Sequence, residues 1–162
     1  DGRPDVLTWQ TAPLTSSVTV AGNVIARLFA STTGSDADWV VKLIDVYPDS
    51  VPGRADFGGY ELMVTGEIMR GRYYRSWQEP AAIPSNQVVP FTVDLHQQSY
   101  TFQPGHRIMV QVQSTWFPLY DRNPQTFVPN IFKARASDYQ PQTHRVYRSA
   151  QSASHVEVDV LP

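Results

Sequence analysis

The chain contains no cysteine among its 162 residues. Disulfide bonds, a thiol nucleophile and a cysteine-based zinc site are therefore excluded, and cysteine usage gives no indication of the redox compartment. Positive charge is not in excess either, because 13 Lys and Arg stand against 15 Asp and Glu, for a net charge of −2. Binding to a phosphate backbone requires a basic surface, so we expect no nucleic acid partner.

Long apolar runs are also missing, since no stretch approaches the roughly 20 residues of a membrane-spanning helix. We expect no membrane partner. With 41% hydrophobic and 17% charged residues, the composition is typical of a globular protein. The length predicts one domain over residues 1–162, large enough for a stable core without cross-links. The chain starts without Met and without a signal peptide, which indicates a processed start or a fragment of a longer protein.

Helical periodicity is scarce, whereas period-2 alternation of apolar and polar residues recurs along the chain. In the run 107–114, Ile108, Val110 and Val112 share one face, which should be core. We predict a turn at 21–23, between the first two strands. The predicted strands cover residues 17–20, 24–30, 39–47, 60–68, 88–95, 107–114 and 155–161.

The connections hold most of the 13 prolines and 9 glycines. Pro104 and Gly105 occupy the two central positions that a type II turn prefers. About eight short strands without intervening helices predict an all-β fold, a jelly-roll β-sandwich. Residues 117–147 depart from this rhythm, with four prolines and scattered aromatics. We interpret them as a long ordered loop, of a length that is uncommon unless the loop is functional or docked.

A serine nucleophile is not expected in this chain. The G-x-S-x-G motif is absent, and Ser114 is followed by Thr115 and Trp116 instead of the small residues that a nucleophile elbow requires. A metal site built on histidine is not expected either, because no two imidazoles have a spacing that would place them on one ion. The histidines are His96, His106, His144 and His155.

Asp36 and Asp38 are the weak candidates for a metal site. They follow the polar segment 31–35, and carboxylate oxygens on a loop are ligands that calcium takes. A third acid and the terminal Glu of a calcium-binding loop are missing, so turn formation and capping are the alternative roles. We therefore predict no cofactor and no metal.

Aromatic residues make up 12% of the chain, which leaves a carbohydrate- or protein-binding β-sandwich open as an alternative. An exposed row of rings can stack on sugars, although packing in the core or at an interface is the more usual role of such rings. The candidates for such a row are Trp39, Tyr73, Tyr74, Trp77 and Trp116.

The segment 114–124 is the most unusual in the sequence. It places several large apolar side chains beside an Arg and an Asp on a loop, and Trp, Tyr and Arg are enriched in binding hot spots. Docking against a partner and folding back on its own sandwich are both open for this segment. The interdomain docking candidates are Trp116, Phe117, Tyr120, Asp121, Arg122 and Asn123.

Residues 104–112, followed by Trp116-Phe117-Pro118 and by 120–124, resemble the C-terminal jelly-roll domain of the X-Pro dipeptidyl-peptidase and cocaine esterase family of serine hydrolases. The segments 26–31, 36–39, 42–48 and 70–75 are similar to that domain as well. Residues 58–64 and 123–132 look most like the branch of α-amino-acid ester hydrolases and glutaryl acylases.

The resemblance implies a galactose-binding-domain-like jelly roll without catalytic residues. In that family the Ser-His-Asp triad lies upstream in an α/β-hydrolase domain with a helical cap, and the jelly roll braces both. It further implies a homo-oligomeric parent acting on esters, β-lactam amides or X-Pro peptides. The family branch favours a periplasmic or secreted location, with a cytoplasmic one left open.

Overall fold

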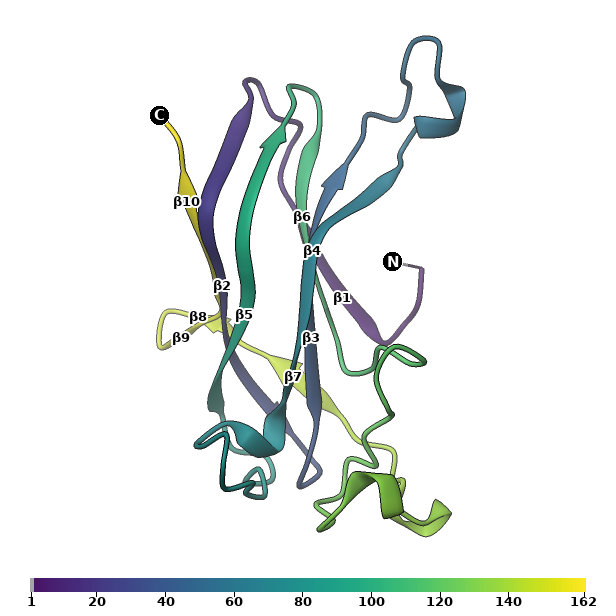
Figure 1. The fold of residues 1–162 in the computed structure, drawn as a ribbon, viewed down its shortest axis with the longest axis vertical. Helices are drawn as coiled ribbons and strands as arrows, with labels where there is room; N and C mark the ends of the chain where they lie inside the picture. Colours follow the sequence, from purple (N-terminus) through teal and green to yellow (C-terminus); the bar gives the residue numbers. More distant parts are fainter. Residues whose placement is uncertain (1) are drawn as a thin grey trace.

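In the computed structural model, which describes residues 2–162, two antiparallel β-sheets face each other and long loops extend from both ends (Figure 1). Four short 3-10 helices lie in the connections: η1 Ala55–Phe57, η2 Gly71–Tyr73, η3 Ile131–Lys133 and η4 Ala136–Asp138. None of the helices in residues 2–162 is long and apolar enough to cross a membrane. The strands are β1 Val6–Gln10, β2 Val18–Thr32, β3 Asp38–Val46, β4 Glu61–Arg70, β5 Val89–Phe102, β6 Arg107–Gln113, β7 His144–Val146, β8 Arg148–Ser149, β9 Ser152–Ala153 and β10 His155–Val160.

One sheet has the order β1-β6-β3-β4 and the other the order β10-β2-β5, with β7 also pairing with β2. β8 and β9 form a separate small hairpin. Apart from β3 and β4, neighbouring strands in the two large sheets are not consecutive in sequence, as expected for crossed-over antiparallel sandwiches. The predicted all-β sandwich is confirmed.

The core lies between the two sheets. Trp39 from β3 is 2% exposed and packs against Phe91 from β5, with ring centroids 5.3 Å apart. Val112 of β6 is buried, and Ile108 and Val110 pack against the core, as the alternation predicts. Gln111 and Gln113, on the opposite face of β6, are buried too, because β6 lies between β1 and β3.

The turn predicted at 21–23 is wrong, because β2 continues through it from Val18 to Thr32. Gly22 has φ +142°, and a Cβ there would lie 2.5 Å from Asp159 Oδ2 of β10. The Asn23 amide donates to that carboxylate at 3.1 Å, and the pairing with β5 shifts register between Asn23 and Ile25. The turn-forming residues therefore mark an irregular point within one strand.

The turn at 103–106 is confirmed, since Gly105 has φ +84° and the His106 amide donates to the Gln103 carbonyl at 3.1 Å. The long loop runs from the end of β6 to the start of β7, and η3 and η4 lie within it. Figure 1 shows this loop, in green, at the lower end of the sandwich, the same end as the connection from β4 to β5.

Candidate docking face

Buried hydrogen bonds hold the loop between β6 and β7 in place. Asn123 is 7% exposed; its Nδ2 donates to Asp38 Oδ1 at 2.9 Å, and its Oδ1 accepts from the Gln125 amide at 2.8 Å. The Gln125 carbonyl accepts from the amides of Ser35 and Asp36, at 3.2 and 3.3 Å. The loop is therefore an ordered surface fixed to the start of β3.

Asp36 is fully buried and anchors the loop through an arginine. Arg72 donates from Nε and Nη2 to Asp36 Oδ2, at 2.9 and 2.7 Å. The same Nη2 donates to the Val128 carbonyl at 2.9 Å, and the guanidinium lies 4.8 Å from the Phe127 ring centroid. This buried ion pair thus joins η2 to the loop.

Asp38 is buried beside Asn123 and Arg70, whose Nη1 lies 3.5 Å from Asp38 Oδ2. Burial raises the pKa of Asp38 to about 6, against the Asn123 hydrogen bond and the charge of Arg70, which lower it. Both weak metal candidates therefore face arginine or amide donors. Within residues 2–162, no three His, Asp or Glu side chains come together in a possible metal site.

Three of the six docking candidates contact strands β3 and β4 of their own domain. Asn123 is one, and Trp116 and Tyr120 are the others, with ring centroids 5.9 Å apart. Lys42 Nζ lies 5.0 Å from the Trp116 ring centroid, and Tyr120 donates its hydroxyl to Glu67 Oε1 at 3.1 Å. This half of the loop folds back on the sheet of β3 and β4.

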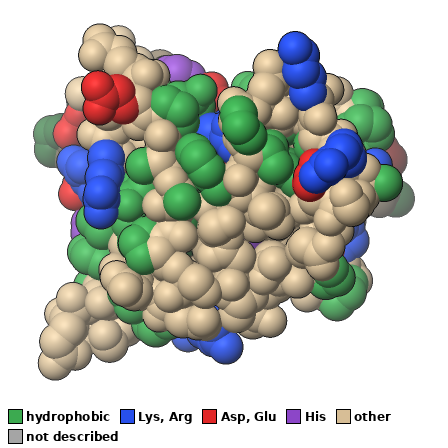
Figure 2. Space-filling view, turned by 90° about the horizontal axis from the view of Figure 1, so that it is seen from below, with side chains coloured by type: hydrophobic (Ala, Val, Ile, Leu, Met, Phe, Trp, Pro, Cys, Tyr) green, Lys and Arg blue, Asp and Glu red, His purple; other side chains and the backbone are tan. Residues whose placement is uncertain are grey.

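The other half faces solvent. Arg122 is exposed, with its guanidinium carbon 5.5 Å from the Phe117 ring centroid and 5.9 Å from that of Tyr139. Asp121 is exposed beside it. Figure 2, viewed from the end that carries the loop, shows several hydrophobic side chains on this surface. We define the loop face as Phe117 (62% exposed), Leu119 (66%), Arg122, Phe132 (78%) and Tyr139 (40%).

Sequence reasoning missed Leu119, Phe132 and Tyr139. For Phe132 a local signal existed, since Asn130 caps η3 by accepting from the Phe132 amide at 2.9 Å. Ile131 next to it is 8% exposed and turns inward. One turn of helix therefore buries one apolar side chain and presents the next to solvent.

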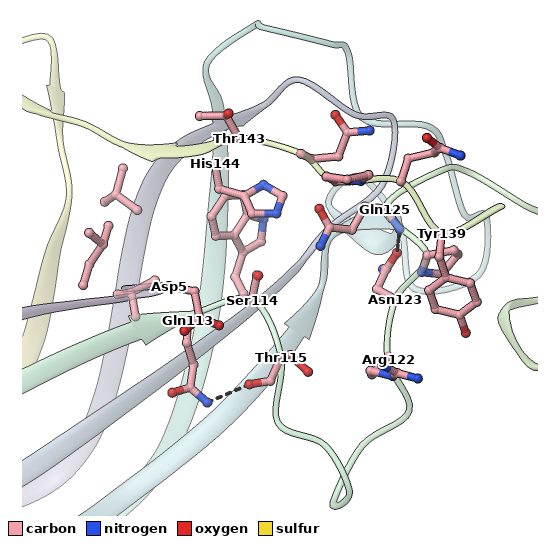
Figure 3. Close-up of a pocket in the computed structure, with 18 of the residues that line it drawn as sticks. Asp5, Gln113, Ser114, Thr115, Arg122, Asn123, Gln125, Tyr139, Thr143 and His144 are labelled. Atoms are coloured by element: carbon pink, nitrogen blue, oxygen red, sulfur yellow. Dashed lines mark hydrogen bonds between the residues drawn. The ribbon is translucent and has the colours of Figure 1, made fainter. Parts of the chain in front are cut away.

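A pocket of about 680 Å³ opens beside the loop face, between the loop and the strand ends (Figure 3). Ser114 follows β6, and His144 begins β7. Arg122 and Tyr139 line the loop side, and Figure 3 shows Asp5 on the opposite side.

Unused hydrogen-bonding groups concentrate around this pocket. Among residues 2–162, six buried side-chain nitrogen and oxygen atoms have no hydrogen-bond partner, and five belong to residues that line it. Burial also lowers the pKa of His144, so its ring is neutral at pH 7. Buried polar groups are normally paired, so these atoms are exceptions within the described part of the chain. The five atoms are Trp39 Nε1, Thr115 Oγ1, Gln125 Oε1 and both ring nitrogens of His144.

Ser114 and His144 line the same pocket but do not form a catalytic pair. Neither ring nitrogen of His144 has a hydrogen-bond partner within residues 2–162. A serine nucleophile requires a base within hydrogen-bond reach and a third group that orients the base. The pocket has neither arrangement. The other histidines each lie beside a single carboxylate: His96 and Glu67, His106 and Asp45, His155 and Glu157.

Comparison with known proteins decides what kind of domain this is. Residues 1–157 match the family of X-Pro dipeptidyl-peptidase C-terminal non-catalytic domains. The chain belongs to this family. It is 36% identical over 159 residues to a cocaine esterase of Rhodococcus sp., covering 98% of this chain and 26% of that protein. A putative serine esterase of Mycobacterium bovis is 30% identical over 175 residues, covering 96% and 24%.

Solved structures agree with this assignment. An α-amino acid ester hydrolase superposes with a TM-score of 0.98 at 55% identity, covering 99% of this chain and 26% of that one. An aminopeptidase from a marine sediment archaeon, Thaumarchaeota archaeon, gives 0.97 at 52% identity with the same coverage. The chain spans about a quarter of the length of these relatives. It is therefore a non-catalytic domain of the kind found in larger hydrolases.

Proposed function

We propose that this domain uses its loop face to dock against the catalytic part of a larger serine hydrolase, and that it braces the α/β-hydrolase and cap domains around the active site. The exposure of Phe117, Leu119 and Phe132 carries the proposal. A free-standing domain rarely holds so much apolar surface on an ordered loop, whereas a docked one buries it.

The parent protein would transfer an acyl group to water through an acyl-enzyme, with the catalytic serine outside this chain. The names of the relatives, an esterase, an ester hydrolase and an aminopeptidase, support ester or amide bonds as the substrate class. β-Lactam amides and X-Pro peptides fall within that class. A homo-oligomeric parent remains a prediction; the exposed Val158, Val160 and Leu161 at the C-terminal end are the surface that would support it.

A chimera tests the docking role. This chain replaces the matching quarter of the α-amino acid ester hydrolase, with and without the double change Leu119→Ser and Phe132→Ser. Each apolar side chain buried at an interface contributes on the order of 2 kcal/mol. We expect the double variant to lower the thermal unfolding midpoint of the chimera by several degrees. The midpoint of the isolated chain should not change, because both residues are exposed there.

Met63→Ser is the matched control, since Met63 is 46% exposed and lies on β4, outside both the loop and the C-terminal surface. Equal midpoints for the double variant and the unmodified chimera would refute docking through the loop face.

A saccharide-binding role is the second candidate, favoured by one observation. Trp77 is 74% exposed and stacks on Tyr73, with centroids 6.1 Å apart and planes 24° from parallel. Both rings line a second pocket, together with Asp94 and His96. Trp39 cannot join such a platform because it is buried in the core. In this alternative the ligand covers Trp77 and leaves the loop face exposed.

A further inference from the structure

Arg122 differs from the arginines around it. Arg72 pairs with Asp36 at 2.7 Å, and Arg135 pairs with Asp138 at 3.3 Å. The Arg122 guanidinium has no ion pair or hydrogen bond with residues 2–162, and instead contacts the rings of Phe117 and Tyr139. Two aromatic contacts limit the positions that the side chain can take while leaving its N–H groups available.

The acids nearest to Arg122 do not neutralise it. Asp121 is adjacent in sequence but forms no ion pair with it within 4 Å. Asp5 lines the same pocket, yet its carboxylate pairs with Arg3 and lies across the pocket from Arg122 (Figure 3). The cation at this edge of the pocket therefore lacks a counter-charge from the described part of the chain.

Residues with unpartnered polar atoms line the pocket behind Arg122, among apolar ones. Thr115 Oγ1 and Gln125 Oε1 are buried without partners, as are the ring nitrogens of the neutral His144. These atoms are shielded from solvent, so an incoming group reaches them only as their side chains turn.

We propose that Arg122 receives the carboxylate of an Asp or Glu side chain on the catalytic part of the parent hydrolase, and that the segment carrying this acid enters the pocket. This inference rests on the docking role proposed above. Guanidinium and carboxylate form two parallel hydrogen bonds, which fix orientation as well as distance. The apolar side chains of the loop face then surround a charged pair and exclude water from it.

The chimera with the α-amino acid ester hydrolase tests this with single changes. Arg122→Gln removes the charge, and Arg122→Glu reverses it. Lys133→Gln is the matched control, because Lys133 is an exposed cation on the same loop that does not line the pocket. Docking is measured by the rate of proteolytic cleavage at the junction between the two parts of each chimera. The thermal unfolding midpoint of the isolated chain is recorded for each variant as well.

We expect Arg122→Gln to increase cleavage at least about tenfold, since removing one partner of a buried ion pair is strongly destabilising. Lys133→Gln should change it less than about twofold, and neither change should alter the midpoint of the isolated chain. Among Asp→Arg and Glu→Arg changes on the catalytic part, one should restore docking to Arg122→Glu.

Equal cleavage of the Arg122→Gln and Lys133→Gln chimeras would overturn the carboxylate assignment while leaving the docking role intact. The carboxylate assignment is also overturned if no Asp→Arg or Glu→Arg change on the catalytic part restores docking of the Arg122→Glu chimera. An unmodified chimera cleaved as fast as an unstructured linker would instead refute the docking role itself, and the Arg122 contact with it.

Discussion

At the scale of single residues, Asp38 links the stability of the loop to pH. Its pKa of about 6 lies above its ordinary value of 3.8, because burial disfavours the charged form. The folded state therefore holds this proton more tightly than the unfolded chain does. The contribution of Asp38 to stability is fully present below about pH 4 and is lost as pH rises through 6, by about 3 kcal/mol.

Asp38→Asn should remove that pH dependence. The asparagine carbonyl still accepts from Asn123, while the buried charge is gone. Urea unfolding between pH 4 and pH 7 should show a flatter profile than the wild-type chain, with the difference concentrated between pH 4 and pH 6. Asp56→Asn, at an exposed acid paired with Arg54, is the control. If wild type and Asp38→Asn keep parallel profiles, the raised pKa is wrong.

At the scale of elements, the close approach of β2 and β10 explains Gly22. Any side chain there meets the Asp159 carboxylate and must also adopt φ +142°. Gly22→Ala should therefore destabilise the chain by about 1–3 kcal/mol in urea unfolding. Gly2→Ala is the matched control, because a Cβ there has nothing within 4 Å. A Gly22→Ala chain as stable as Gly2→Ala would contradict this account of the strand.

The sequence predicts strands well where most side chains are buried, as in β3, because an apolar and β-branched run interrupted only by Lys42 and Asp45 is typical of a buried strand. The sequence-based prediction fails at Gly22 because residues 21–23 are compatible with either a turn or an irregular point within a strand. The choice depends on Asp159, 136 positions away from Asn23.

The docking candidates show the same limit. Local composition marks the segment 114–124 as unusual. Trp116 and Tyr120 nevertheless turn inward, because they contact Lys42 and Glu67 on strands distant in sequence. Phe132 turns outward on a single helical turn that Asn130 caps, while Ile131 next to it is buried.

At the scale of the whole molecule, the domain combines a well-packed core with an end that exposes large apolar side chains. The interior is closed around Trp39, Phe91 and Phe102, and the polar network of Asp36 and Arg72 fixes the loop. The same loop leaves the apolar side chains of Phe117, Leu119 and Phe132, the Arg122 cation and a pocket open to solvent. A domain about a quarter the length of its relatives can carry such an end if the rest of the protein covers it.

Hydrogen–deuterium exchange of the isolated chain and of the chimera with the α-amino acid ester hydrolase tests this claim most directly. We predict slower exchange in residues 117–139 of the chimera than in the same residues of the isolated chain. A saccharide-binding role would instead slow residues 73–77 when sugar is added to the isolated chain. Equal exchange rates at 117–139 in the isolated chain and the chimera would contradict docking through the loop face.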